Sequence, residues 1–230
     1  MIDLFAIDDE ELAYSWEDRE QKYRANNYYG AQSPSAIDVL NGSRDIIVTA
    51  PHALHHFRDG RKKPADRWTG ACAELLHLGL DATAIIPTGP IPDWTTWDER
   101  DDPFRQALDR LCTPETLVID LHGMSNAHGV DVCVGLGPEP AADTGEFAEW
   151  LVDSLRPYEV SLNEPFSAAP HYTVTSHVQT RTPADAIQVE MALRVRDPAD
   201  HPQRSADFLR RLASSIRKFA DCRTPPTAAG

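Results

Sequence analysis

Short apolar runs rich in β-branched residues alternate along this chain with segments of helical periodicity, and this alternation constrains the fold more than any other feature. The runs are typical of buried strands. They cover residues 45–50, 83–87, 117–121, 130–136 and 187–193. Elsewhere apolar residues recur at helical spacing, with helices expected from Trp68 to Leu80, from Phe104 to Leu111, from Phe147 to Leu155 with Asp143 or Thr144 as N-cap, and from Phe208 to Phe219. Strands interleaved with helices predict an α/β domain around a largely parallel central sheet.

The 230 residues contain no internal repeat and no Pro/Gly/Ser-rich linker long enough to divide the chain. We therefore expect a single domain over residues 1–230, with a helical lead-in over 1–40 and a flexible tail over 223–230. The cysteines are widely spaced and form no CxxC pair, which fits a reducing compartment and argues against a structural zinc knuckle.

The charge and the N-terminus bear on partners and location. The net charge of −14 disfavours binding to a phosphate backbone, so we expect no nucleic-acid partner. The first residues are acidic where a signal peptide would be basic, and no window approaches the ~20 apolar residues of a membrane span. We expect a cytoplasmic protein with no membrane partner. The basic residues of segment 58–63 form either a solvated loop or an anion-attracting rim beside a site.

Three of the expected strands end in residues suited to metal chemistry. His52 follows the run 45–50, His122 follows 117–121, and Glu190 lies within 187–193. Ligands bind at the carboxyl ends of parallel strands, where these side chains would converge. A half-buried imidazole needs a partner, which a metal ion supplies. The sequence therefore predicts a metal site built on His52 and His122.

A catalytic zinc site commonly adds a carboxylate to two histidines. Asp66 is the first candidate, although it could instead cap the helix that begins near Trp68. Glu74, within that helix, is the second candidate. We expect Asp120 on the face of its strand opposite to His122, as a supporting residue rather than a ligand.

The other histidines carry less information. We expect His55 and His56 in a loop, whereas His171 and His177 lie in a polar stretch that could overhang a site. No supporting context surrounds His77, His128 or His201.

Glu190 is flanked by apolar residues, and burying a carboxylate is costly unless it is paired or functional. Next to a metal site it could act as a general base. The alternative is an ion pair with Arg194 on the same face of the strand.

Several blocks together resemble the N-formylglutamate amidohydrolase family. They are TAPHA, KPADRWTGACAELL, VIDLHG, VDVCVG, NEPF and AIQVEMALR, in this order between about residues 45 and 198. The resemblance implies a three-layer α/β/α fold with a mixed, largely parallel central sheet, as in zinc carboxypeptidases. It also implies one divalent metal ion, zinc by preference, held by His52, Asp66 and His122, with Glu190 as the catalytic residue.

The resemblance further implies arginines that bind substrate carboxylates through bidentate contacts. Arg100, Arg181 and Arg194 are the candidates, and Arg58 is a further one. The chain departs from the family pattern at Ala53, in the segment TTWDERDDPF, and at His55, where zinc carboxypeptidases carry the glutamate of HxxE. The first two departures affect the substrate pocket and suggest a substrate other than N-formylglutamate, and the third places the carboxylate ligand further along the chain.

These observations predict a metal-dependent hydrolase that cleaves an amide of N-formyl or N-acyl amino acid type, using metal-activated water and Glu190 as general base. The expected partner is a small molecule bearing a carboxylate. One alternative is a catalytically inactive relative that binds a small acidic ligand. Another is a cysteine hydrolase using Cys133, although its run resembles a core strand, where a thiol is inert.

Overall fold

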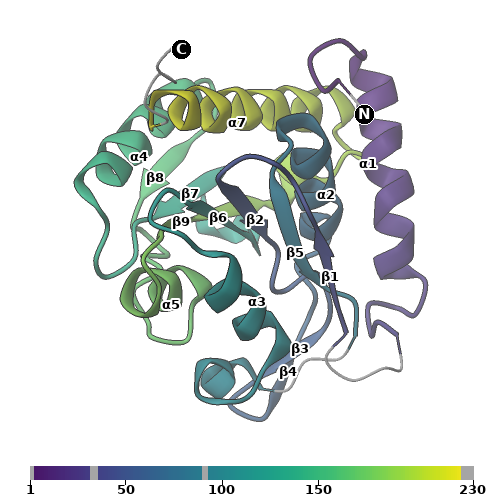
Figure 1. Ribbon diagram of the computed structural model, residues 1–230. Coiled ribbons are helices and arrows are strands. Elements are labelled where there is room, and N and C mark those ends of the chain that lie inside the picture. The colour runs from purple at the N-terminus through teal and green to yellow at the C-terminus, as the bar shows by residue number, and fades with distance from the viewer. Residues whose placement is uncertain (1–2, 32–35, 90–92, 224–230) are drawn as a thin grey trace.

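A seven-stranded sheet forms the centre of the computed structural model, which describes residues 3–31, 36–89 and 93–223 (Figure 1). In spatial order its strands are β1 (Ile37–Leu40), β5 (Thr83–Pro87), β2 (Ile46–Thr49), β6 (Leu117–Met124), β9 (Asp185–Ala192), β7 (Val132–Gly135) and β8 (Val160–Leu162). The four strands β5, β2, β6 and β9 are parallel. Strands β1 and β7 run antiparallel to their neighbours β5 and β9, and β8 is parallel to β7. The mixed, largely parallel sheet confirms the predicted α/β class.

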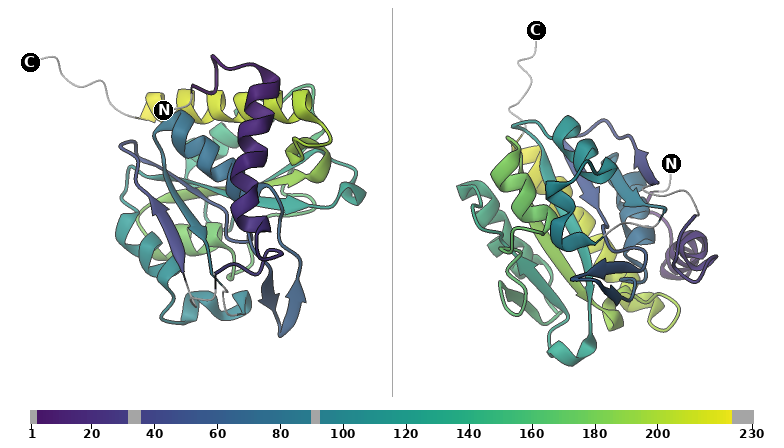
Figure 2. Two further views of the ribbon diagram at one scale, coloured as in Figure 1. Left: turned by 90° about the vertical axis from the view of Figure 1, so that its right-hand side faces the viewer. Right: turned by 90° about the horizontal axis from the view of Figure 1, so that it is seen from below.

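Helices cover both faces of this sheet (Figure 2). Successive strand residues point to opposite faces, so Val48 and Ile119 enter one hydrophobic cluster and Ile47 and Val118 the other. The first cluster is covered by α1 (Asp9–Arg24), α2 (Thr69–Leu80), α4 (Ala142–Ser154), α6 (Leu193–Arg196) and α7 (Pro202–Arg223). The second is covered by η1 (Trp94–Glu99), α3 (Pro103–Leu111) and α5 (Val174–Arg181). The predicted three-layer arrangement is confirmed.

The helix α7 buries an apolar stripe at helical spacing that includes Phe208, Leu212 and Ile216. The N-terminal helix α1 lies across this layer and contacts both α7 and α2 (Figure 1). Asp8 caps α1 by accepting from the backbone N–H of Glu11, and Trp16 is fully buried against the layer. Helix α1 therefore packs against the outer face of this helix layer, over α2 and α7.

The strands and helices expected from the sequence are all present, with bounds that shift by up to six residues. The expectation of Asp143 or Thr144 as the N-cap of α4 is wrong, because α4 begins at Ala142 and both residues lie inside it. Other elements were not expected: β1, β8, α5, α6, η1, the 3-10 turn η2 (Asn126–His128) and the hairpin of β3 (His56–Arg58) and β4 (Arg61–Lys63).

Residues 1–40 are not purely a helical lead-in, because 37–40 form an edge strand. This strand is short and only half-buried, so its sequence pattern is weak. The expected tail lies outside the described residues, apart from Arg223, which ends α7.

No helix in the described ranges combines the length and apolar character that a membrane crossing requires.

Candidate metal centre

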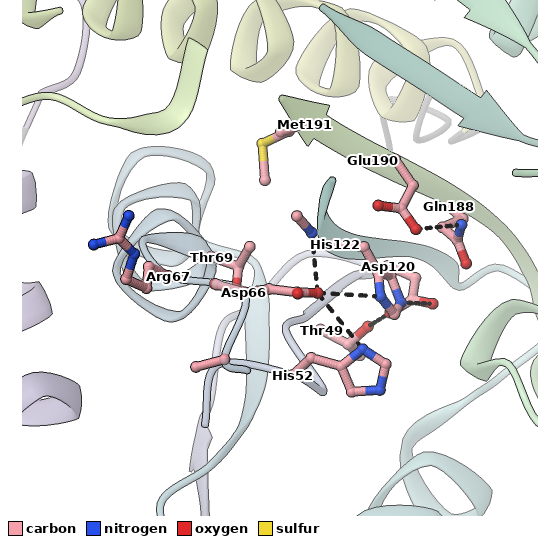
Figure 3. A network of polar contacts seen from close by, with 12 residues as sticks. Thr49, His52, Asp66, Arg67, Thr69, Asp120, His122, Gln188, Glu190 and Met191 are labelled. Atoms are coloured by element: carbon pink, nitrogen blue, oxygen red, sulfur yellow. Dashed lines mark hydrogen bonds and ion pairs between the residues drawn. The ribbon is translucent and has the colours of Figure 1, made fainter. Parts of the chain in front are cut away.

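The central parallel strands bring the predicted site residues to one edge of the sheet (Figure 3). His122 lies in the second half of β6, directly opposite Glu190 on the neighbouring strand β9. On the other side of β6, strand β2 ends at Thr49, and His52 follows in the loop. The topology therefore supports the expected convergence of these three residues.

Asp66 reaches this edge from the loop between β4 and α2. Its backbone N–H donates to the carbonyl of His52 at 2.8 Å, and its Oδ2 accepts from the backbone N–H of Gly123 at 3.0 Å. A side chain at Gly123 would collide with the guanidinium of Arg196, so glycine permits this close packing. The N-cap of α2 is Trp68, and the Asp66 carboxylate makes no cap contact. The alternative of Asp66 as a helix cap is therefore wrong.

The Asp66 carboxylate lies between the two histidine rings (Figure 3). Its Oδ2 is 3.5 Å from Nδ1 of His52 and 3.7 Å from Nδ1 of His122. These separations are long for hydrogen bonds. Two ligand atoms that each lie ~2.1 Å from a tetrahedral metal ion are ~3.4 Å apart from each other. The observed spacing therefore suits a shared metal ion. Among the described residues, no other three or more His, Cys, Asp or Glu side chains bring their ligand atoms as close together as these.

Asp120 contacts the ring of His122 on the side away from Asp66. Its Oδ2 lies 3.0 Å from Nε2 of His122, and its Oδ1 accepts from the Thr49 hydroxyl at 2.7 Å. The expectation that Asp120 faces away from His122 is wrong, because residues two apart on a strand point to the same face. A carboxylate on one ring nitrogen leaves the other free for a metal ion, and metal-binding histidines commonly have such a partner.

Asp120→Asn should weaken metal binding by 10- to 100-fold, because the His122 ring loses the charge that raises its basicity. Competition titration against a chromophoric chelator measures this change in Kd. The unfolding midpoint of the metal-free variant controls for damage to the fold. An unchanged Kd in a folded variant would contradict the supporting role of Asp120.

The ring of His52 is fixed by aromatic packing. It stacks on His56 with centroids 3.8 Å apart and planes 7° apart, and Trp94 contacts it edge-on at 5.2 Å. His56 is buried in β3, so the expectation of a loop residue is wrong. Burial lowers the pKa of His52 to about 4 and that of His56 to about 2. His52 is therefore neutral near pH 7, which is the form that binds metal.

In the other two members of the cluster, His122 and Asp66, neighbouring charges and contacts outweigh the effect of burial on the pKa. Burial alone would lower the pKa of His122, but the charges and contacts of Asp120 and Asp66 raise it well above its ordinary value. Burial likewise opposes the ionisation of Asp66, yet its contacts with His122 and His52 hold its pKa well below the usual range. The site thus concentrates negative charge around His122, and a divalent cation is the natural competitor for the His122 proton.

Glu190 is 7% exposed and accepts from the Gln188 amide at 3.1 Å. Burial raises the pKa of Glu190 to about 7; nearby His122 opposes the rise, and Asp66 adds to it. A carboxyl group that titrates near neutral pH suits proton transfer. Arg194 lies beyond the strand in α6 and binds Asp131, so the alternative ion pair with Glu190 is wrong.

A cavity of about 180 Å³ opens beside these residues. His52, His122 and Glu190 line it, together with Arg58 from the β3–β4 hairpin and aromatic residues such as Tyr172. The sequence did not predict the aromatic residues of this cavity, because Phe166 and Tyr172 lie in loops and Trp94 begins a short 3-10 helix. The basic run that contains Arg58 was a signal, and one of its two interpretations was an anion-attracting rim.

The other three arginines named from the sequence do not line this cavity. Arg100 donates to the Asp93 carbonyl at 2.7 Å, Arg181 lies at an open cleft beside Asp109, and Arg194 binds Asp131. Glu74, the second ligand candidate, accepts from Tyr23 at 2.6 Å and from Lys22 at 2.8 Å, toward α1. The contacts of Arg100, Arg194 and Glu74 hold these side chains away from the cluster.

His171 and His177, which the sequence placed in a polar stretch that could overhang the site, do not reach the metal cluster. His177 is buried in α5 and pairs with Asp109 at 2.8 Å. His171 is mostly exposed, 3.7 Å from Asp98. Tyr172, between them, is the residue that reaches the cavity.

Cys133 is buried in β7 and donates to the carbonyl of Phe166 at 3.3 Å. Burial raises the pKa of its thiol, which disfavours the thiolate that nucleophilic catalysis requires. The geometry therefore gives no support to a cysteine hydrolase.

The loop that carries Asp66 ends at a strained residue. Trp68 has a φ of +75°, a left-handed conformation that bulky residues rarely adopt. The helix α1 holds this residue from both sides: Glu20 accepts from its backbone N–H at 2.7 Å, and Trp16 donates to its carbonyl at 3.0 Å. Glu20 thereby helps to fix the loop that orients Asp66.

Burial raises the pKa of Glu20 from 4.5 to about 7. The folded protein therefore binds the carboxyl proton of Glu20 more tightly than the unfolded chain does. The stability that this proton contributes is lost as pH rises from about 4.5 to about 7. Glutamine does not titrate, so Glu20→Gln should not show this loss. Between pH 4.5 and pH 8, the unfolding free energy of the wild type should therefore fall by roughly 3 kcal/mol relative to that of the variant. Denaturant unfolding with a chelator present tests this, and parallel pH profiles for the two proteins would contradict it.

Comparisons with known proteins agree on the fold. No protein-family model matches the chain, and no curated protein matches its sequence. The structure is similar to N-formylglutamate amidohydrolase from Ralstonia eutropha JMP134, with a TM-score of 0.55 and 12% identity over 82% of this chain and 98% of that one. It is similar to a bacteriophage poly-gamma-glutamate hydrolase, with a TM-score of 0.54 and 14% identity over 81% of this chain and 87% of that one.

A metallo-carboxypeptidase from Burkholderia cenocepacia is also similar, with a TM-score of 0.51 and 11% identity over 94% of this chain and 70% of that one. The chain therefore has a zinc-carboxypeptidase-like fold, and its structural neighbours include N-formylglutamate amidohydrolase, as the sequence resemblance implied.

Proposed function

We propose that this protein is a metal-dependent hydrolase that cleaves the amide bond of a small N-acyl amino acid or a similar carboxylate-bearing substrate. One observation carries the proposal: a compact His–Asp–His cluster and a buried carboxyl group line or adjoin one cavity. The named activities of the structural neighbours, amide and peptide hydrolysis, support the same reaction class.

His52, Asp66 and His122 would hold one divalent ion, with zinc the first expectation for two imidazoles and a carboxylate. Such an ion supplies Lewis-acid polarisation of the scissile carbonyl and makes water more acidic. Asp120 keeps the His122 ring oriented through Nε2, and the stack on His56 does the same for His52. The protein's part is to place these donors before substrate arrives.

Glu190 performs the proton transfers. Its carboxylate accepts a proton from water as the water oxygen bonds to the amide carbon, and it then delivers that proton to the amine nitrogen as the carbon–nitrogen bond breaks. Its raised pKa of about 7 allows both steps near neutral pH. The contact with the Gln188 amide leaves its second oxygen for this transfer. The products are a carboxylic acid and a free amine.

The alternative is an inactive relative that binds a small acidic ligand. A carboxyl group with a pKa of about 7 beside a His–Asp–His cluster suits proton transfer, which a protein that only binds a ligand does not perform. We therefore favour the enzyme.

A panel of N-formyl and N-acetyl amino acids and short peptides, incubated with chelator-treated protein reconstituted with zinc, cobalt or manganese, tests the proposal. Liberated amine should accumulate only after metal is restored. Absence of turnover on every substrate, together with undiminished ligand binding in chelator, would favour the binding protein.

A further inference from the structure

The cavity beside the cluster contains an arginine with no carboxylate partner. Arg58 lines the cavity, and its guanidinium lies 5.3 Å from the centroid of the Tyr172 ring. Its Nε is buried without a hydrogen-bond partner, and within the described ranges it forms no ion pair. An unpaired buried donor is costly, and a ligand carboxylate would satisfy it in the bidentate geometry that arginine favours.

Arg58 is held firmly in place. It ends β3, and the turn that follows is fixed to η1: the backbone N–H of Asp59 donates to Asp93 at 3.0 Å and to Thr95 at 2.9 Å. The backbone N–H of Gly60 also donates to Asp93. A cation held by a braced hairpin needs little reorganisation when an anion binds.

Away from the metal cluster, the cavity offers no second cation. Apart from the histidines of the metal cluster, Arg58 is the single basic side chain in the lining found for the described residues. The remaining stretches, 1–2, 32–35, 90–92 and 224–230, contain no lysine, arginine or histidine. Tyr172 lies beside Arg58, and Phe166 and Val174 are further apolar residues that line the same cavity. The volume of about 180 Å³ slightly exceeds that of a ~150 Å³ apolar cavity known to hold benzene. The space therefore suits one apolar group of ring size.

On the basis of the proposed function, we propose that the site selects amides of amino acids with one carboxylate, which Arg58 binds, and one apolar side chain, which packs against Phe166, Tyr172 and Val174. A glutamate side chain would place a second carboxylate against these apolar residues, where no cation compensates its desolvation. The site therefore rejects N-acyl glutamate and other dicarboxylates.

Steady-state kinetics on the metal-reconstituted protein test the selection. The value of kcat/KM should be at least about 100-fold higher for N-acetyl-L-phenylalanine than for N-acetyl-L-glutamate, since the unpaired charge is penalised. Arg58→Ala should lower kcat/KM for N-acetyl-L-phenylalanine by at least about tenfold and should affect N-acetyl-L-phenylalaninamide, which lacks the carboxylate, much less. Arg61→Ala is the matched control, because Arg61 is the exposed register partner of Arg58 on the same hairpin.

A preference for N-acetyl-L-glutamate, or an equal effect of Arg58→Ala on the acid and the amide, would overturn the inference while leaving the proposed function intact. Calorimetric binding of both N-acetyl amino acids to Glu190→Gln separates the two further. If the wild type hydrolyses neither but the variant binds only the phenylalanine derivative, the proposed function fails and the selectivity stands. Binding that favours the glutamate derivative refutes the selectivity.

Discussion

Glu190→Gln should lower kcat by 10²- to 10⁴-fold while the protein still binds one metal ion, because general acid–base groups contribute factors of this size. Glutamine retains the shape and the oxygen that accepts from Gln188, but it cannot take a proton from water at neutral pH. The expected KM is close to that of the wild type, since the lost interaction belongs to the transition state. Initial rates on the best substrate of the panel, with metal content measured on the same samples, give both quantities.

The matched control is Glu149→Gln, which makes the same chemical change at an exposed position of α4. Near-normal kcat for Glu190→Gln would remove Glu190 from the reaction. Loss of metal from this variant would instead indicate that Glu190 is a ligand rather than a base.

Asp66→Ala should raise the Kd for the metal ion by more than 100-fold. The variant should therefore be inactive when less than one equivalent of metal is present. Removing a direct ligand exceeds the 10- to 100-fold effect of removing a residue that only orients one. The side chain also accepts from the Gly123 backbone, so the metal-free variant should be somewhat less stable than the wild type. Chelator competition titration and thermal unfolding measure the two effects separately.

Glu74→Ala distinguishes the two carboxylates named from the sequence. Because Glu74 contacts Tyr23 and Lys22 near α1, its variant should keep the metal affinity of the wild type. Metal retention by Asp66→Ala together with metal loss from Glu74→Ala would reverse the ligand assignment.

The sequence predicted the parts of the fold whose patterns repeat. Buried parallel strands such as β2 and β6 contain continuous apolar runs, so both these runs and the histidines that follow them could be recognised. Strand β1 is short and half-buried, and β8 has only three residues, so neither carries enough of a pattern. The parallel arrangement of β2, β6 and β9 then explains why His52, His122 and Glu190 meet.

Loop geometry could not be predicted in the same way. Asp66 is consistent in sequence with either a cap or a ligand, and the choice depends on a left-handed turn at Trp68 that contacts with α1 maintain. Arg58 enters the cavity only because a three-residue strand and a braced turn direct the hairpin toward it. These are long-range contacts, to which local sequence patterns are insensitive.

Titration of the chelator-treated protein with cobalt(II) tests the metal site most directly, because low-coordinate cobalt absorbs visible light independently of any substrate. One ion held by His52, Asp66 and His122 predicts saturation at one equivalent, with an absorption of four- or five-coordinate cobalt that is absent from His122→Ala and Asp66→Ala but present in Glu190→Gln. Absence of stoichiometric binding, or an unchanged spectrum in His122→Ala and Asp66→Ala, would contradict the assignment.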